Sequence, residues 1–190
     1  MTHPTTPSRV PADATPEGDA VVVGAGKIRV DAFIDFLCPF CRQFELSSQS
    51  VLAGLTADGR ASVAYHPMNF LDEASTTNYS TRAAAASGCA ADQGRFVDFA
   101  HALFVNQPPE GGPGLSDAEL AGLGQSAGLD SAPFTACLSD GRYLDWPAYV
   151  TARAIAAGVE ATPTVLVAGE PVRAEGPAIA AAVTRASEAR

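Results

Sequence analysis

From residue 20 onwards, short runs of apolar residues predict β-strands. Ala20–Val23 is such a run, and a glycine turn at 24–26 leads into a longer one at 28–37. The longer run alternates at first and is apolar on both faces in its second half, which is typical of a central strand covered on both sides. A helix is expected directly after it, and a third strand at 61–65 that ends at His66.

Helical periodicity then continues from about 75 to 158. Phe96, Phe99 and Leu103 fall on one helical stripe, and Ser116 with Glu119 has the spacing of a capping box at the start of another helix. A loop rich in proline and glycine at 108–114 separates these two helices. The block is therefore expected to be entirely helical.

The end of the chain returns to strands, at 164–167 and 172–174, before a last helix. Together the elements predict an α/β fold: one mixed sheet flanked by helices, with an inserted all-helical domain. The sheet domain would comprise residues 20–74 and 158–190, and the helical insertion residues 75–157. Residues 1–19 hold four prolines and no periodic pattern, so we expect a flexible arm there.

Composition excludes several classes of function. The 190 residues are 47% hydrophobic and carry a net charge of −9, so a disordered chain is excluded and nucleic acid is not an expected partner. No apolar run approaches the ~18 residues that a membrane span needs. The N-terminal arm has no apolar core and is not a signal peptide as written. The location would be extracytoplasmic if a signal or anchor was removed, and cytoplasmic if Met1 is the native start.

Two of the four cysteines form a Cys-x-x-Cys pair at the point where the predicted central strand meets a helix. At a helix N-terminus, the unpaired N–H groups and the helix dipole stabilise an anion, so Cys38 is placed to be a thiolate. Cys41 lies one turn further on, close enough to form a disulfide with Cys38. The pattern predicts an exposed nucleophile, Cys38, with a more buried resolving partner.

A second stretch, GVEATPTVLV at 158–167, places Thr162-Pro163 directly before a strand. Together with FIDFLCPFCRQFE at 33–45 and the helical block between them, it resembles the DsbA-like branch of the thioredoxin superfamily. The resemblance covers residues 20–188 in element order and is specific at these two stretches only.

The resemblance implies thiol–disulfide oxidoreductase activity and a role for each residue of the two motifs. Cys38 and Cys41 would be catalytic, Pro39 and Phe40 would tune the redox potential, and Thr162 with a cis Pro163 would bind substrate. Many members carry a buried carboxylate six residues before the first cysteine, where this chain has Ala32. Asp35 is closer but is assigned to the other strand face, so no proton-shuttling acid is predicted.

The remaining cysteines, Cys89 and Cys137, have two interpretations. They could be buried free thiols, or they could pair across the helical block, as the resemblance to actinobacterial members with a second disulfide implies. We favour a structural disulfide, worth roughly 4 kcal/mol in the chain-entropy model. A zinc site at Cys38 and Cys41 would need further ligands from His66, His101, Cys89 and Cys137, none of which has zinc-site spacing, so no metal is expected.

As an oxidase, the protein would pass its disulfide to thiol-containing proteins or peptides without a cofactor. A membrane oxidant of the quinone-linked type would regenerate it, and we expect a monomer. The alternatives are a reductase or isomerase that uses the same dithiol, and a non-catalytic binding module that keeps the fold. His66 and Trp146 are assigned to packing rather than to chemistry.

Overall fold

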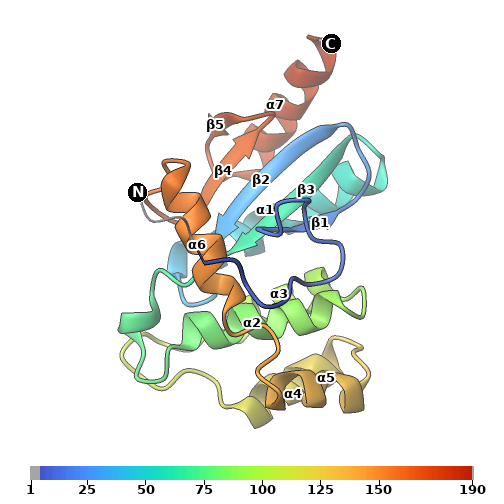
Figure 1. The fold of residues 1–190 in the computed structure, drawn as a ribbon. Coiled ribbons are helices and arrows are strands. Elements are labelled where there is room, and N and C mark those ends of the chain that lie inside the picture. Colours follow the sequence, from blue (N-terminus) through green and yellow to red (C-terminus); the bar gives the residue numbers. More distant parts are fainter. Residues whose placement is uncertain (1–4, 190) are drawn as a thin grey trace.

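The structure is a computed structural model that describes residues 5–189, and its centre is one five-stranded sheet. The strands lie in the order β1-β3-β2-β4-β5 (Figure 1). The pair β2 and β3 is parallel, whereas the other neighbours are antiparallel. The predicted mixed sheet is thereby confirmed, with strands β1 (Val21–Val23), β2 (Ile28–Ile34), β3 (Ala61–Pro67), β4 (Thr164–Val167) and β5 (Glu170–Val172).

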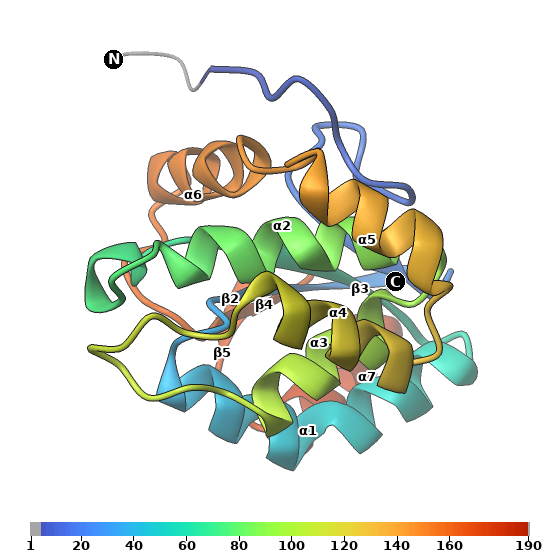
Figure 2. The same cartoon turned by 90° about the horizontal axis from the view of Figure 1, so that it is seen from below.

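Helices cover both faces of this sheet (Figure 2). The face that carries α1 and α7 is opposite the face that carries α2 and α6, and α3 packs beside both α1 and α2. The helices are α1 (Pro39–Ala57), α2 (Tyr79–Ala91), α3 (Phe96–Val105), α4 (Asp117–Ser126), α5 (Ser131–Ser139), α6 (Trp146–Ala156) and α7 (Gly176–Glu188), with a 3-10 turn at Asp72–Ala74. The predicted capping box is present, because Ser116 and Glu119 bond each other's backbone N–H groups.

Strand β2 occupies the middle of the sheet because both of its edges are paired. Val30 is paired with Val63 of β3 and with Val167 of β4, and its side chain is fully buried. A strand in this position buries both faces, which explains its apolar second half. The carboxyl end of β2 therefore lies deep within the fold, at the start of α1.

Several strand boundaries differ from the prediction. β1 begins at Val21 rather than at Ala20, and β3 continues to Pro67 rather than ending at 65. β2 ends at Ile34 rather than at 37, because the N–H groups of Leu37 and Cys38 bond back to Asp35 and form a turn. β5 lies at 170–172 rather than at 172–174. Its glycine turn places Val172 opposite Val165, so the pairing begins as soon as the chain reverses.

Residues 8–19 of the expected flexible arm, which we call the N-terminal strap, are hydrogen-bonded to other parts of the chain. The strap lies over α6 and the end of α2 (Figure 2). Side chains at the start of α6 bond the strap's backbone: Asp145 accepts from the N–H of Ser8, and the Trp146 Nε1–H donates to the Gly18 carbonyl at 2.8 Å. A proline-rich segment has no hydrophobic period from which its structure could be predicted. Its backbone N–H and C=O groups can still be paired, because side chains from other segments bond them. Residues 1–4 of the predicted arm lie outside the described residues.

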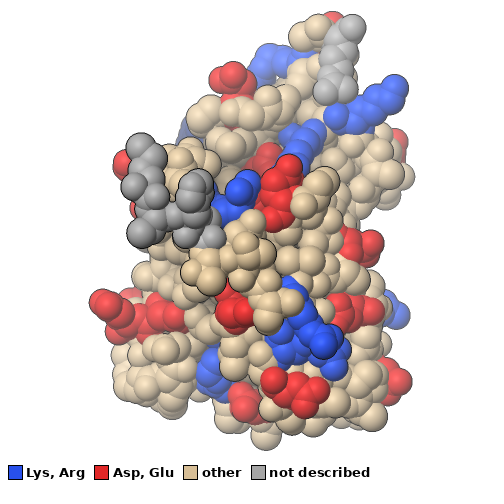
Figure 3. All heavy atoms as spheres, in the orientation of Figure 1, with Lys and Arg blue, Asp and Glu red and all other residues tan. Residues whose placement is uncertain are grey.

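Charged side chains of both signs are interleaved on the face shown in Figure 3. That distribution agrees with the acidic balance of the sequence and offers no continuous basic surface on this face for a polyanion. Among residues 5–189, none of the helices combines the length and the apolar character that crossing a membrane requires.

Candidate active site around Cys38

The turn at the end of β2 places Cys38 at the N-terminus of α1. The Cys38 N–H donates to the Asp35 carbonyl at 3.1 Å, which closes the turn. Cys38 is the N-cap residue of α1 and Pro39 is its first helical residue, a position where proline loses no hydrogen bond. The sulfur of Cys38 is thus held beside the unpaired N–H groups of the first helical turn.

Hydrogen bonds to the sulfur of Cys38 lower its pKa to about 6. The largest contribution is the hydrogen bond from the Cys41 thiol, and the Thr162 side chain and the backbone N–H groups of Cys41 and Phe40 add to it, against the opposing effect of burial. When protonated, the Cys38 thiol donates to the Thr162 carbonyl, with 3.4 Å between sulfur and oxygen. At neutral pH, Cys38 is therefore largely a thiolate, which is the reactive form.

Cys41 has the opposite character. Burial raises its pKa far above that of a free thiol, and its hydrogen bond to Cys38 raises it further. Its sulfur accepts from the Asp35 N–H at 3.4 Å, and the residue is fully buried. Both cysteines are free in this structure. The pair thus combines one stabilised thiolate with one thiol that keeps its proton.

The expectation of an exposed nucleophile needs correction. Only 4% of the surface of Cys38 is accessible, against none for Cys41. The two residues between the cysteines, Pro39 and Phe40, are exposed, Phe40 at 69%. The two cysteines are therefore distinguished by hydrogen bonding and charge more than by access to solvent.

Pro163 lies next to the Cys-x-x-Cys pair, and the Thr162–Pro163 peptide bond is cis. The chain leaves this bond directly into β4, so two segments separated by more than 120 residues meet at one site. A groove of about 440 Å³ begins here and is lined by Phe40, Gln43, Phe44, Ser47, Thr162, Pro163 and Arg173–Glu175. It could hold an extended peptide alongside the exposed Phe40 ring.

Asp35 is a site residue that sequence reasoning missed. Its carboxylate is fully buried and accepts hydrogen bonds from the N–H groups of Leu37 and Leu71 and from the Ser80 hydroxyl, at 2.7–3.0 Å. Burial raises its pKa to about 6, and the negative charge of Cys38 contributes. Counting alternate faces along β2 misplaced it, because the strand ends at Ile34. The sequence did carry one signal of a buried carboxylate, because Asp35 is the only polar residue in the apolar run 32–37.

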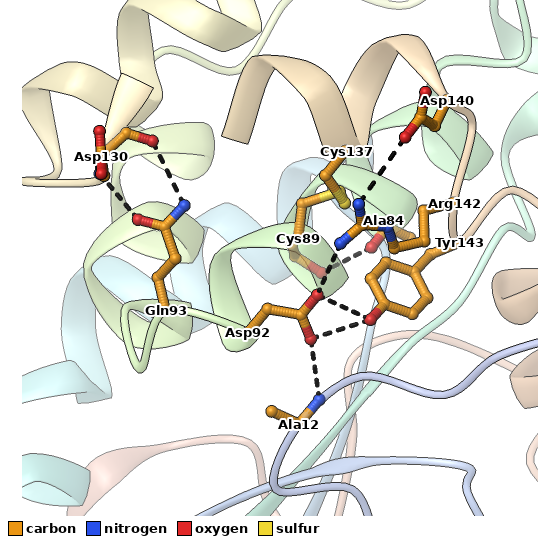
Figure 4. The surroundings of a disulfide bond; sticks show 11 residues. Ala12, Ala84, Cys89, Asp92, Gln93, Asp130, Cys137, Asp140, Arg142 and Tyr143 are labelled. Atoms are coloured by element: carbon orange, nitrogen blue, oxygen red, sulfur yellow. Dashed lines mark hydrogen bonds and ion pairs between the residues drawn. A yellow bond between two sulfur atoms is a disulfide. The ribbon is translucent and has the colours of Figure 1, made fainter. Parts of the chain in front are cut away.

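Cys89 and Cys137 are bonded to each other and join α2 to α5 (Figure 4). Asp92, three residues after Cys89, accepts from the Tyr143 hydroxyl at 2.8 Å and from the Ala12 N–H of the strap. Figure 4 shows this carboxylate between the strap, α2 and the turn after α5. The disulfide therefore lies beside the contacts that hold the strap.

The other residues weighed for zinc or for chemistry have separate partners. His66 is buried, stacks on Phe33 and contacts Asp31 at 3.0 Å, while His101 contacts Glu45. Trp146 is fully buried in the core. Within residues 5–189, no three His, Cys, Asp or Glu side chains are grouped as metal ligands.

Comparison with known proteins agrees with this geometry. The family model described as thioredoxin matches residues 18–183. The chain belongs to the thioredoxin family. It is similar to the crystal structure of oxidised DsbA from Mycobacterium tuberculosis, with 35% identity, 80% and 84% of the two chains covered, and a TM-score of 0.71. It is equally similar to the reduced disulfide bond oxidoreductase DsbG of that organism, with 35% identity, 84% and 82% covered, and a TM-score of 0.73.

This thioredoxin-family chain is accordingly a thiol–disulfide oxidoreductase of the DsbA type, as predicted. It also matches the serine/threonine-protein kinase PknE of M. tuberculosis, with 39% identity over 132 residues, or 65% of this chain. The chain spans only 23% of the length of that kinase, so the kinase name does not transfer to it.

Proposed function

We propose that this thioredoxin-family chain is an oxidase that passes a Cys38–Cys41 disulfide to pairs of thiols in substrate proteins. A substrate thiolate attacks the Cys38 sulfur; a mixed disulfide forms and the bond to Cys41 breaks. Cys41 leaves with the electron pair and takes up a proton. The second substrate thiolate then attacks the substrate sulfur of the mixed disulfide and releases Cys38 as a thiolate. The substrate loses two electrons, and the enzyme dithiol gains them.

The observation that carries this proposal is the stabilised thiolate of Cys38. Its pKa of about 6 makes Cys38 a good leaving group in the last step. The same hydrogen bonds stabilise the reduced protein relative to the oxidised one, and a stabilised reduced form makes the disulfide a stronger oxidant. The raised pKa of Cys41 supports the first step, because this sulfur holds the proton it receives.

Substrate binding is assigned to the loop around the cis proline. Thr162 and Pro163 lie beside Cys38 and would pair with an extended substrate segment by strand addition. Pro39 and Phe40, which separate the two cysteines, would tune the redox potential through the first turn of α1. The partners we propose are thiol-containing proteins or peptides, which would be oxidised, and a membrane oxidant of the quinone-linked type, which would regenerate the disulfide. We propose that the protein itself is a monomer.

The division into domains is also a proposal. Residues 20–74 and 158–190 would form the thioredoxin-like domain, and residues 75–157 a helical insertion. The element order supports it, because α2–α6 all lie between β3 and β4 in the chain. Residue 190 lies outside the described residues.

Equilibration with glutathione buffers, together with insulin reduction and oxidation of a dithiol peptide, tests the direction. We expect a potential more oxidising than about −200 mV, compared with about −270 mV for thioredoxin, and rapid peptide oxidation. A potential near that of thioredoxin with fast insulin reduction would establish the reductase alternative. Absence of exchange in every assay would establish a binding module. Cys38→Ser is the matched control for background oxidation.

A further inference from the structure

The turn that carries Cys38 is held by a side chain outside both sequence motifs. Gln107 is half-buried and lies just after the end of α3. Its Nε2 group donates to the carbonyl oxygen of Phe36 at 2.9 Å and to that of Cys38 at 3.0 Å. One amide group thus bridges the two carbonyls that flank Leu37 in the turn.

The orientation of this amide is determined by its partners. Both contacts are carbonyl oxygens, which can only accept, so the NH₂ end of Gln107 must face the turn. Each of its two hydrogens has one acceptor, so the donor capacity of the NH₂ group is fully used. A side chain of the same size without these hydrogens would leave two carbonyls of a half-buried turn without that donor.

Gln107 is itself fixed in place by the end of α3. The Arg42 Nε–H of α1 donates to the Phe104 carbonyl at 3.0 Å, and the ring of Phe104 packs against that of Phe36 with centroids 5.0 Å apart. The Gln107 N–H also returns to the Phe104 carbonyl. The backbone from which the Gln107 side chain extends is therefore fixed by contacts with Phe36, before Cys38 in the chain, and with Arg42, after it.

The contacts of Cys38 link Gln107 to the nucleophile. The Cys38 carbonyl also accepts the Arg42 N–H, the first hydrogen bond of α1. The backbone N–H groups of Phe40 and Cys41, which lower the pKa of Cys38, belong to that same first turn. Because all of these groups belong to one helical turn, a change in the orientation of the Cys38 carbonyl would also change the orientation of the Phe40 and Cys41 N–H groups.

We propose that Gln107 is a positioning residue for thiol–disulfide exchange, which holds the Cys38 turn so that the N–H groups of the first turn of α1 face the Cys38 sulfur. This inference rests on the proposed function for its consequence in catalysis. Gln107 lies 69 positions after Cys38, at the end of α3, so the helical block would support the chemistry indirectly by holding this turn.

The test compares Gln107→Met with Gln93→Met in the full chain. Gln93 is a second half-buried glutamine whose amide bonds backbone, donating to the Asp130 carbonyl and accepting from its N–H at 2.7 Å (Figure 4). Its contacts join α2 to the start of α5, so Gln93→Met controls for the loss of a backbone-bonding amide elsewhere in the helical block.

The measurement is the pH dependence of iodoacetamide alkylation of the reduced protein, with thiolate absorbance at 240 nm. We expect Gln107→Met to raise the pKa of Cys38 by about half a unit or more, so that the rate at pH 5 falls about threefold, in proportion to the thiolate fraction. The equilibrium constant with glutathione should shift by a similar factor towards the oxidised protein. Gln93→Met should leave both unchanged.

An unchanged pH profile in a folded Gln107→Met variant would overturn the proposal, as would equal shifts in both variants. If Gln107→Met does not fold, Gln107→Asn is measured in its place. Its amide is one methylene too short to keep both bonds, so an intermediate shift is expected and an unchanged profile overturns the proposal. Because alkylation needs no substrate protein, failure of the oxidase function would not obscure this result.

Discussion

At the scale of single residues, the structure gives two cysteines of one motif opposite acid–base behaviour. Cys38 receives hydrogen bonds from Cys41, Thr162 and the first turn of α1, and its pKa falls to about 6. Cys41 is enclosed on all sides, and burial raises its pKa. The roles of nucleophile and resolving thiol follow from this difference in protonation at neutral pH.

The first prediction separates these roles by single substitutions. Cys38→Ser should abolish exchange completely. Cys41→Ser should retain attack by Cys38 and accumulate mixed disulfides with a peptide, because the resolving thiol is gone. Mass spectrometry of each variant after incubation with a peptide disulfide measures the adducts. Adducts on Cys38→Ser but not on Cys41→Ser would reverse the assignment.

Asp35 supports a second prediction, because its buried charge opposes the thiolate of Cys38. Replacing it by asparagine removes a negative charge from a buried position near the sulfur. Asp35→Asn should therefore lower the pKa of Cys38, by up to about one unit, as measured by absorbance at 240 nm against pH. It should also destabilise the fold by about 1–3 kcal/mol, since an amide cannot accept all three hydrogen bonds.

The matched variant for Asp35 is Ser80→Ala. It removes the shortest of the three hydrogen bonds to the carboxylate but keeps the charge. It should cost stability without lowering the pKa of Cys38. If both variants moved this pKa upward, Asp35 would act by holding the turn, and its charge would not be the main influence on the thiolate.

At the scale of elements, the Cys89–Cys137 disulfide joins α2 to α5 and lies beside the strap contacts of Asp92. The third prediction is that replacing both cysteines by alanine lowers the free energy of unfolding by about 2–4 kcal/mol. Denaturant unfolding in buffer without reductant measures it. Exchange per folded molecule should be unchanged, because neither sulfur contacts the Cys38 turn. A double variant as stable as the parent would argue against a structural role.

Hydrophobic patterning predicted most elements within a few residues because burial on one face leaves a period in the chain. It failed where polar contacts decide the backbone. The end of β2 depends on the Asp35 carboxylate, whose partners Leu71 and Ser80 come from other segments. The strap is held by side chains more than 100 residues away, such as Asp145 and Trp146.

The candidate site divides in the same way. The motifs around Cys38 and Pro163 are contiguous in sequence and could be recognised there. Gln107 could not, since its amide acts on carbonyl groups that every residue possesses, and only the fold brings them together. A glutamine in a loop rich in proline and glycine carries no local signal of its partner.

At the scale of the whole molecule, the charge state of Cys38 links the redox state to folding stability. In the reduced protein, Cys38 has a folded pKa of about 6, against about 8.5 in an unfolded chain. Because the folded pKa is depressed, the thiolate stabilises the fold most above the unfolded value and loses this effect as pH falls through 6. The oxidised protein has no thiol at this position and lacks the contribution.

The fourth prediction follows: reduced protein should be more stable than oxidised protein at pH 7, by on the order of 1 kcal/mol from this group. The gap should narrow towards pH 5, where Cys38 is protonated in both folded and unfolded chains. It should also shrink above about pH 9, because Cys41 ionises on unfolding but not in the fold. Asp35 titrates near pH 6 in the reduced protein. Its carboxylate is present in both forms, so most of its effect cancels in the comparison. Denaturant unfolding of both forms from pH 5 to 10 measures the gap, and a more stable oxidised form at pH 7 would contradict the oxidase direction.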